Sequence, residues 1–173
     1  MKQLSGTELK RLHRQWRKNE PPRLSILLEG LGGPFNLGAI LRTAAAYRVE
    51  HLYLAGMQID PTSTNVGKTA LGADRYVPWT VHEDWASGAQ AARDAGFRLV
   101  GLELADQAVP MHEADLSGPT CLVIGHEDRG LSKTALGDCD GVVFLPQLGR
   151  IGSLNVATAT SIAIWEARRH SWE

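Results

Sequence analysis

The stretch Leu145-Pro146-Gln147-Leu148-Gly149-Arg150-Ile151-Gly152-Ser153-Leu154-Asn155-Val156-Ala157 runs from a polar loop directly into a long apolar segment. Serine and asparagine are poor choices inside a helix because their side chains compete for backbone hydrogen bonds, but they suit a helix start. We therefore predict a helix over 153–169. Ser153 or Asn155 either caps this helix or leaves its free N–H groups to a ligand.

Two further segments place polar residues directly after a short apolar run. Asn36-Leu37-Gly38-Ala39-Ile40-Leu41-Arg42-Thr43-Ala44 follows the apolar run 24–28, and Gly125-His126-Glu127-Asp128-Arg129-Gly130-Leu131-Ser132 follows the apolar run 121–124. Both are typical of strand–loop–helix junctions. Open α/β sheets bind ligands at the carboxyl ends of their strands, so these segments are candidates for a ligand site.

The rest of the chain alternates short apolar runs with helical patterns, which indicates an α/β fold with a mostly parallel sheet flanked by helices. The predicted strands are 24–28, 51–55, 75–79, 97–103, 120–125 and 142–145. The predicted helices are 7–18, 36–48, 64–72, 83–95, 132–137 and 153–169. We divide the chain into a basic N-terminal extension, 1–22, and one domain, 23–173.

Composition is that of a compact domain and excludes several classes of protein. The chain has 173 residues, of which 43% are hydrophobic, and this is enough to bury a sizeable core. Neither Cys121 nor Cys139 has the spacing of a metal ligand, so we expect no metal. The first 22 residues are too polar for a signal peptide, and no apolar stretch reaches the roughly 18 residues of a membrane span. We expect a cytoplasmic protein without a membrane partner.

Charge is unevenly distributed along the chain. Residues 1–23 carry seven basic and two acidic side chains, whereas the whole chain has a net charge of -1. Leu9, Leu12 and Trp16 recur at helical spacing, which predicts an amphipathic helix docked by its apolar stripe. Its outward cations, Arg11, Arg14 and Lys18, are candidates for binding RNA phosphates, although a merely solvated charged helix has the same pattern.

A glycine-rich stretch after the first predicted strand invites comparison with dinucleotide-binding loops. It reads Gly30-Leu31-Gly32-Gly33-Pro34, and Phe35 follows. Proline and phenylalanine stand where a pyrophosphate needs consecutive free N–H groups, and the G-x-G-x-x-G pattern is absent. The sequence therefore disfavours a dinucleotide.

Taken in order, the three polar segments resemble the three motifs of the SpoU/TrmH family of SPOUT RNA methyltransferases. The resemblance runs from about residue 24 to residue 169. It implies a single SPOUT domain with a C-terminal deep trefoil knot, threaded over roughly 120–160. It further implies a homodimer that binds S-adenosylmethionine and methylates ribose 2′-hydroxyl groups of RNA.

The same resemblance assigns a cofactor pocket to the three motifs. Its lining would come largely from backbone around Leu102, Glu103, Gly125, Leu145, Gly149, Ser153 and Leu154. Leu145 and Leu154 also fit a core role. Glycines are expected where main chain approaches the ligand, and we expect this of Gly125, Gly130, Gly149 and Gly152.

The catalytic residues implied by the resemblance are Arg42, Asn36, Glu127, Ser153 and Asn155. A guanidinium stays protonated at neutral pH and has no acceptor, so we expect Arg42 to hold a phosphate and stabilise the forming alkoxide. Alternatively, Arg42 forms a surface ion pair with Glu50 or Glu29 and has no part in the reaction. Glu127 is expected to orient the pocket by accepting hydrogen bonds from backbone or from Asn36.

The sequence departs from the family pattern at two places. Arg48 stands where relatives commonly have glycine, so either the turn differs or Arg48 is left-handed. Asp128-Arg129 replaces small or aromatic residues at the expected pocket mouth. Two alternatives stay open: an inactive RNA-binding scaffold and a base methyltransferase. Among RNA partners, the small size of the chain favours tRNA over rRNA.

Overall fold

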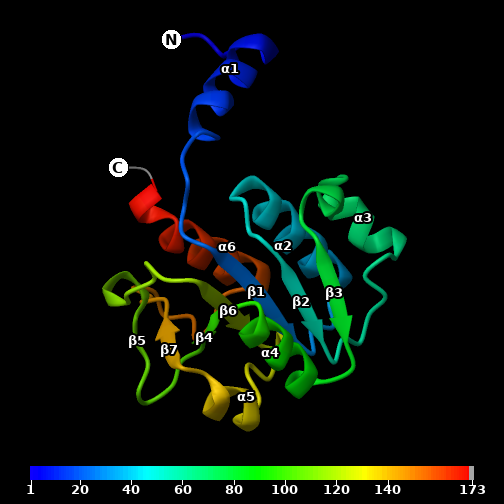
Figure 1. Ribbon diagram of the computed structural model, residues 1–173, viewed down its shortest axis with the longest axis vertical. Coiled ribbons are helices and arrows are strands. Elements are labelled where there is room, and N and C mark those ends of the chain that lie inside the picture. Colours follow the sequence, from blue (N-terminus) through cyan, green and yellow to red (C-terminus); the bar gives the residue numbers. More distant parts are fainter. Residues whose placement is uncertain (172–173) are drawn as a thin grey trace.

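The computed structural model describes residues 1–171 and contains one parallel sheet (Figure 1). The strand order is β3-β2-β1-β6-β4-β7-β5, and every neighbouring pair is parallel. The strands are β1 (Leu24–Glu29), β2 (Leu52–Ala55), β3 (Trp79–His82), β4 (Arg98–Leu102), β5 (Val109–Pro110), β6 (Thr120–Ile124) and β7 (Gly141–Phe144). This confirms the predicted α/β class; the threaded knot stays a prediction.

Helices cover both faces of the sheet, and two hydrophobic cores lie beneath them (Figure 1). One face carries α2 (Pro34–Ala46), α3 (Thr64–Ala70) and α6 (Val156–Ala167); the other carries α4 (Trp85–Asp94) and α5 (Lys133–Asp138). Along β1, Ile26 and Leu28 face the first core and Leu27 faces the second, as strand alternation requires. Within residues 1–171, every helix is too short or too polar to cross a membrane.

The predicted strand at 75–79 is wrong. Ala73–Tyr76 form a 3-10 helix instead, and β3 begins at Trp79. Proline has no N–H to give to a sheet ladder, so the regular strand starts only after Pro78, whose carbonyl still accepts from Leu52 N at 3.0 Å. The two-residue edge strand β5 was not predicted from the sequence.

The last helix begins three residues later than predicted. Asn155 is its N-cap, and its Oδ1 accepts from Ala157 N at 3.0 Å and Thr158 N at 3.1 Å. Of the two capping candidates, Asn155 is thus the cap, while Ser153 lies in the preceding loop. Because that loop is not helical, Ser153 and Leu154 are left to line a cavity described below.

The N-terminal helix α1 (Gly6–Trp16) stands away from the body of the molecule (Figure 1). Ser5 and Glu8 form a capping box at its start. No α1 residue is buried, and Leu9, Leu12 and Trp16 are 43%, 39% and 48% exposed. Among the described residues, the apolar stripe is therefore not buried against the body as expected. Arg11 and Arg14 are exposed on the helix, and Lys18 lies just beyond its end.

A buried arginine joins both ends of the domain. Arg168, at the end of α6, is 2% exposed and donates to the carbonyls of Tyr47 at 2.9 Å, Arg48 at 2.8 Å and Pro22. Burial, followed by the nearby charge of Arg48, lowers the pKa of the Arg168 guanidinium to about 10. The guanidinium thus satisfies backbone carbonyls of two other segments.

Candidate active site

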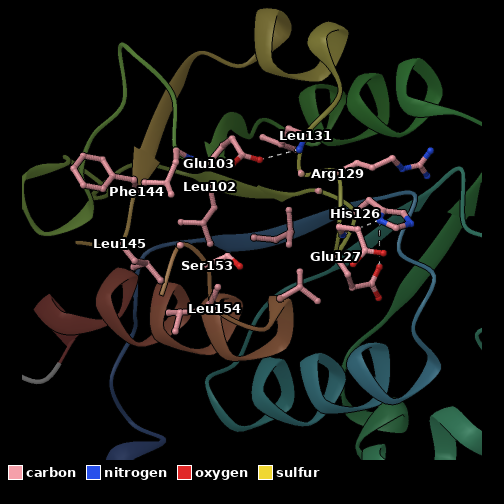
Figure 2. Close-up of a pocket in the computed structure, with 18 of the residues that line it drawn as sticks. Leu102, Glu103, His126, Glu127, Arg129, Leu131, Phe144, Leu145, Ser153 and Leu154 are labelled. Atoms are coloured by element: carbon pink, nitrogen blue, oxygen red, sulfur yellow. Dashed lines mark hydrogen bonds and ion pairs between the residues drawn. The ribbon is translucent and has the colours of Figure 1, made fainter. Parts of the chain in front are cut away.

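A cavity of about 400 Å³ opens at the carboxyl ends of β4, β6 and β7 and beside the start of α6 (Figure 2). Leu102, Leu145 and Leu154 converge on it from three different segments (Figure 2). Six of the seven predicted cofactor residues line this cavity: Leu102, Glu103, Gly125, Leu145, Ser153 and Leu154. Gly149 is not among the lining residues.

The loop between β6 and α5 folds back on itself beside the cavity. His126 N donates to Gly130 O at 3.1 Å, and Gly130 N donates to His126 O at 2.9 Å. A Cβ at Gly125 would lie 2.2 Å from the carbonyl carbon of Gly130, so glycine is required here by the loop itself. A Cβ at Gly149 or Gly152 would meet no protein atom within 4 Å, so the protein itself does not require glycine at either position, and their approach to a ligand stays a prediction.

Glu103 ties that loop to the end of β4. Its carboxylate accepts from Leu131 N at 3.0 Å and from Leu104 N at 2.9 Å. Both oxygens therefore serve backbone groups, and the side chain fixes one wall of the cavity (Figure 2). Glu103 was predicted for its backbone, and its carboxylate adds this structural role.

Glu127 gathers three donors from the start of α2. Its Oε1 accepts from Gly33 N at 2.7 Å and Asn36 Nδ2 at 3.1 Å, and its Oε2 accepts from Gly32 N at 3.1 Å. This confirms the predicted hydrogen bonds. A Cβ at Gly33 would lie only 2.6 Å from Oε1, so the glycine stretch admits the carboxylate.

The charge of Glu127 suits its position at the amino end of a helix. Burial alone raises the pKa of the carboxyl, but the hydrogen bonds from Asn36 and from backbone N–H groups lower it more, and the net pKa lies below its usual value of 4.5. Glu127 is therefore a carboxylate at neutral pH and can only accept hydrogen bonds.

Asn36 connects Glu127 to the start of α6. Its Oδ1 accepts from Asn155 Nδ2 at 3.0 Å, while its Nδ2 donates to Glu127. A further contact between the same two helices joins the hydroxyls of Thr43 and Ser161 at 3.0 Å. The chain Glu127–Asn36–Asn155 thus connects one residue from each of the three polar segments, and it fixes the orientation of both amides.

Arg42 is exposed on α2, outside the cavity lining. Within residues 1–171, its guanidinium makes no hydrogen bond or ion pair. The two carboxylates considered as its partners are engaged elsewhere: Glu50 pairs with Arg23 at 2.6 Å, and Glu29 accepts from Ser132 N at 2.9 Å. The ion-pair alternative for Arg42 is therefore not what the structure shows.

Sequence reasoning did not assign two polar residues of the cavity, His126 and Gln147. Gln147 belongs to its lining, and Gln147 Oε1 is buried without a hydrogen-bond partner in the described part of the chain. An unpaired buried acceptor is costly unless a bound molecule supplies a donor. The only feature of the sequence that pointed to Gln147 was its place just after the last predicted strand, 142–145. The described residues contain no cluster of side chains suited to a metal ion.

Known proteins resemble this chain over most of its length. The chain is 35% identical over 158 residues to an uncharacterized tRNA/rRNA methyltransferase of Synechocystis, covering 91% of this chain but 57% of the relative. It is 32% identical over 171 residues to a tRNA (guanosine(18)-2′-O)-methyltransferase of Thermus thermophilus, covering 98% of this chain and 86% of the relative.

A solved structure has the same fold. The AdoMet-bound rRNA methyltransferase from Sinorhizobium meliloti superposes with a TM-score of 0.81 at 31% identity, over 90% of this chain and 60% of that one. The chain thus spans somewhat more than half the length of two of these three proteins. The model of the SpoU rRNA Methylase family matches residues 23–165. This match covers most of the chain, and the protein belongs to the SpoU rRNA methylase family.

Proposed function

We propose that the protein transfers the methyl group of S-adenosylmethionine to a ribose 2′-hydroxyl of RNA. The observation that carries this proposal is the hydrogen-bonded chain Glu127–Asn36–Asn155 at the edge of the cavity, since it joins all three motif segments at one place. The names of the Thermus and Sinorhizobium relatives support the reaction and the cofactor.

The cavity suits S-adenosylmethionine in size and chemistry. Its volume of about 400 Å³ falls in the range of small-molecule sites. Leucine side chains offer apolar walls to an adenine ring, and the unpaired Gln147 Oε1 is an acceptor for a ligand N–H. When bound, the cofactor supplies an electrophilic methyl group on a sulfonium. We assign its binding to the six lining residues named above, with Gly149 in the adjoining loop.

Arg42 is the group best suited to the RNA side of the reaction. Its guanidinium is exposed, always charged and free of protein partners among the described residues, so it can bind a phosphate and stabilise negative charge growing on the ribose oxygen. One hydrogen bond joins the side chains of Asn36 and Asn155, and their other hydrogen bonds hold both amides in fixed orientations. We assign them, with Glu127 and Ser153, to positioning the two substrates.

RNA recognition requires cations beyond the reaction centre. Arg11, Arg14 and Lys18 are all exposed, on α1 and just after it, and we assign them to RNA phosphates. The substrate class we favour is tRNA, because the Thermus relative, 86% of which is covered, is named for a tRNA position. We place this activity in the cytoplasm.

Transfer of a labelled methyl group tests the proposal. The protein is incubated with methyl-labelled S-adenosylmethionine and, separately, with unmodified tRNA and rRNA, and the RNA is digested to nucleosides. We expect a 2′-O-methylnucleoside from one RNA class. Label on a base would replace the ribose assignment by base methylation. No transfer together with no cofactor binding would identify the inactive scaffold.

We propose that the active form is a homodimer built on α6. Ile162 and Trp165 are large apolar side chains of this helix, yet they are 43% and 49% exposed. Trp165 packs edge-on against Tyr47 with ring centroids 5.7 Å apart. Large apolar side chains exposed next to each other are typical of a surface that another molecule covers.

Charge on the α6 surface is expected to break the dimer. Ile162→Glu puts a carboxylate into the contact twice, once per subunit, because a two-fold interface repeats every residue. We expect dimer affinity to fall by at least about a hundredfold, equivalent to about 2.7 kcal/mol. Analytical ultracentrifugation measures the change. Val81→Glu, on edge strand β3 and 56% exposed, is the matched control and should stay dimeric. A monomeric wild type would contradict the proposal.

A further inference from the structure

Arg48 adopts a backbone conformation that favours glycine. Its φ is +52°, in the left-handed region, which is the second of the two alternatives that the sequence left open. This conformation is unfavourable for a non-glycine residue because its Cβ crowds the backbone. Its charge also lies close enough to the buried Arg168 to affect that guanidinium. An arginine is therefore locally unfavourable here, and contacts of its side chain can offset the cost.

The Arg48 side chain reaches across to the end of the N-terminal helix. Arg48 Nη1 donates to Asn19 O at 2.8 Å and to Arg17 O at 3.3 Å. Arg17 is the C-cap of α1, where carbonyls lack helical partners and the helix dipole attracts a cation. Arg48 thus supplies a charged cap to a helix that belongs to a distant part of the sequence.

Polar contacts of the segment that follows α1 also hold the helix to the body. No residue of α1 is buried. Beyond it, Asn19 Nδ2 donates to Ser171 O at 2.9 Å, and Arg168 holds the carbonyl of Pro22. Since Arg168 also binds the carbonyl of Arg48, the two arginines fix the segment 17–22 against the ends of α2 and α6.

We propose that Arg48 is a positioning residue for RNA binding, which caps α1 and holds its basic side chains toward the RNA. This inference rests on the proposed function, because it takes α1 as part of the RNA surface. Arg48 need not touch RNA itself. Its effect passes through the direction of α1, and losing the cap lets the helix adopt many directions, which costs entropy on binding.

Arg48→Gly in the full chain tests the proposal, because glycine relieves the strained backbone and removes only the side-chain contacts. We expect hydrogen exchange of α1 and residues 17–20 to accelerate, and the thermal midpoint to stay unchanged or rise. The KM for RNA should rise about tenfold, with kcat and cofactor affinity within twofold. Arg48→Lys keeps the charge but has a single donor group, so its KM should lie between those of wild type and Arg48→Gly.

A variant without the basic side chains of α1 distinguishes whether Arg48 positions the helix or binds RNA directly. The triple variant Arg11→Gln, Arg14→Gln and Lys18→Gln removes the cations that Arg48 is inferred to position. In the triple variant, Arg48→Gly should raise the KM by less than a further twofold, because the cations that Arg48 positions are already absent. A full further increase would show that Arg48 itself binds RNA and would overturn the inference, as would unchanged hydrogen exchange in α1. An unchanged KM in the triple variant would instead refute the proposed RNA role of α1.

Discussion

Arg42→Ala is expected to lower kcat for methyl transfer by roughly a hundred- to a thousandfold, the loss typical of removing a group that stabilises developing negative charge. Arg42 is exposed and makes no hydrogen bond or ion pair with another described residue, so the protein gains nothing evident for its own stability from this guanidinium. A substitution should therefore leave the fold intact and act on the reaction. Initial rates under saturating cofactor and RNA measure the effect.

The affinity of Arg42→Ala for the cofactor shows whether Arg42 acts on the reaction or whether its loss damages the pocket. Arg42 is not part of the cavity lining, so isothermal titration with S-adenosylmethionine should give the same Kd for Arg42→Ala and wild type within about twofold. Arg42→Lys keeps the charge but loses the planar fork that binds a phosphate through two N–H groups, and it should recover only a small part of kcat.

A matched arginine controls for the loss of surface charge. Arg75 is exposed on the 3-10 helix after α3, and its guanidinium contacts nearby groups, Gly72 O at 2.9 Å and the ring of Tyr76. Arg75→Ala removes the same charge and should keep kcat within about threefold. If Arg42→Ala behaved like Arg75→Ala, Arg42 would have no part in the reaction.

The position of the site could be predicted from sequence because it depends on local patterns. An apolar run followed by polar residues indicates where a strand ends, and parallel strands end at a common edge. Two segments were assigned to that edge in this way. The hydrogen bond between Glu127 and Asn36 was predicted from their proposed roles, and the structure confirms it at 3.1 Å.

Other features depend on packing that a local pattern does not contain. Asn155 and Asn36 are 119 residues apart, and their hydrogen bond follows from the placement of α2 against α6. Arg168 and Gln147 look like ordinary surface residues in the sequence, and only their burial gives them a role. The amphipathic stripe of α1 was predicted to be buried, yet Leu9, Leu12 and Trp16 are 43%, 39% and 48% exposed, because a helical pattern does not specify what packs on it.

Glu127→Gln is the second substitution expected to have a large effect. The carboxylate accepts at both oxygens, from Gly32 N at one and from Gly33 N and Asn36 Nδ2 at the other. A glutamine amide replaces one acceptor by an NH₂ group, which then faces a donor. An unsatisfied pair of this kind costs about 1–3 kcal/mol, so we expect kcat/KM to fall roughly ten- to a hundredfold.

The pH dependence of stability provides an independent measurement. The folded-state pKa of Glu127 lies below its ordinary value of 4.5, so ionisation of this group stabilises the fold above that value. The stabilisation is lost as pH falls through the folded-state pKa. Urea unfolding should therefore show a constant difference between wild type and Glu127→Gln above about pH 5, narrowing at lower pH. A difference that grew on acidification would contradict the assigned shift.

A double variant shows whether Glu127 acts on the reaction through Asn36 and Asn155. Asn155→Ala removes the donor to Asn36 Oδ1, and Glu127→Gln disturbs the other end of the same amide. If the three side chains position substrates as one unit, the double variant should lose little more kcat/KM than the worse single variant. Losses that multiply would mean that Glu127 and Asn155 act separately. Glu83→Gln, an exposed carboxylate outside this hydrogen-bonded chain, controls for the change in charge and should leave both rate and additivity unaffected.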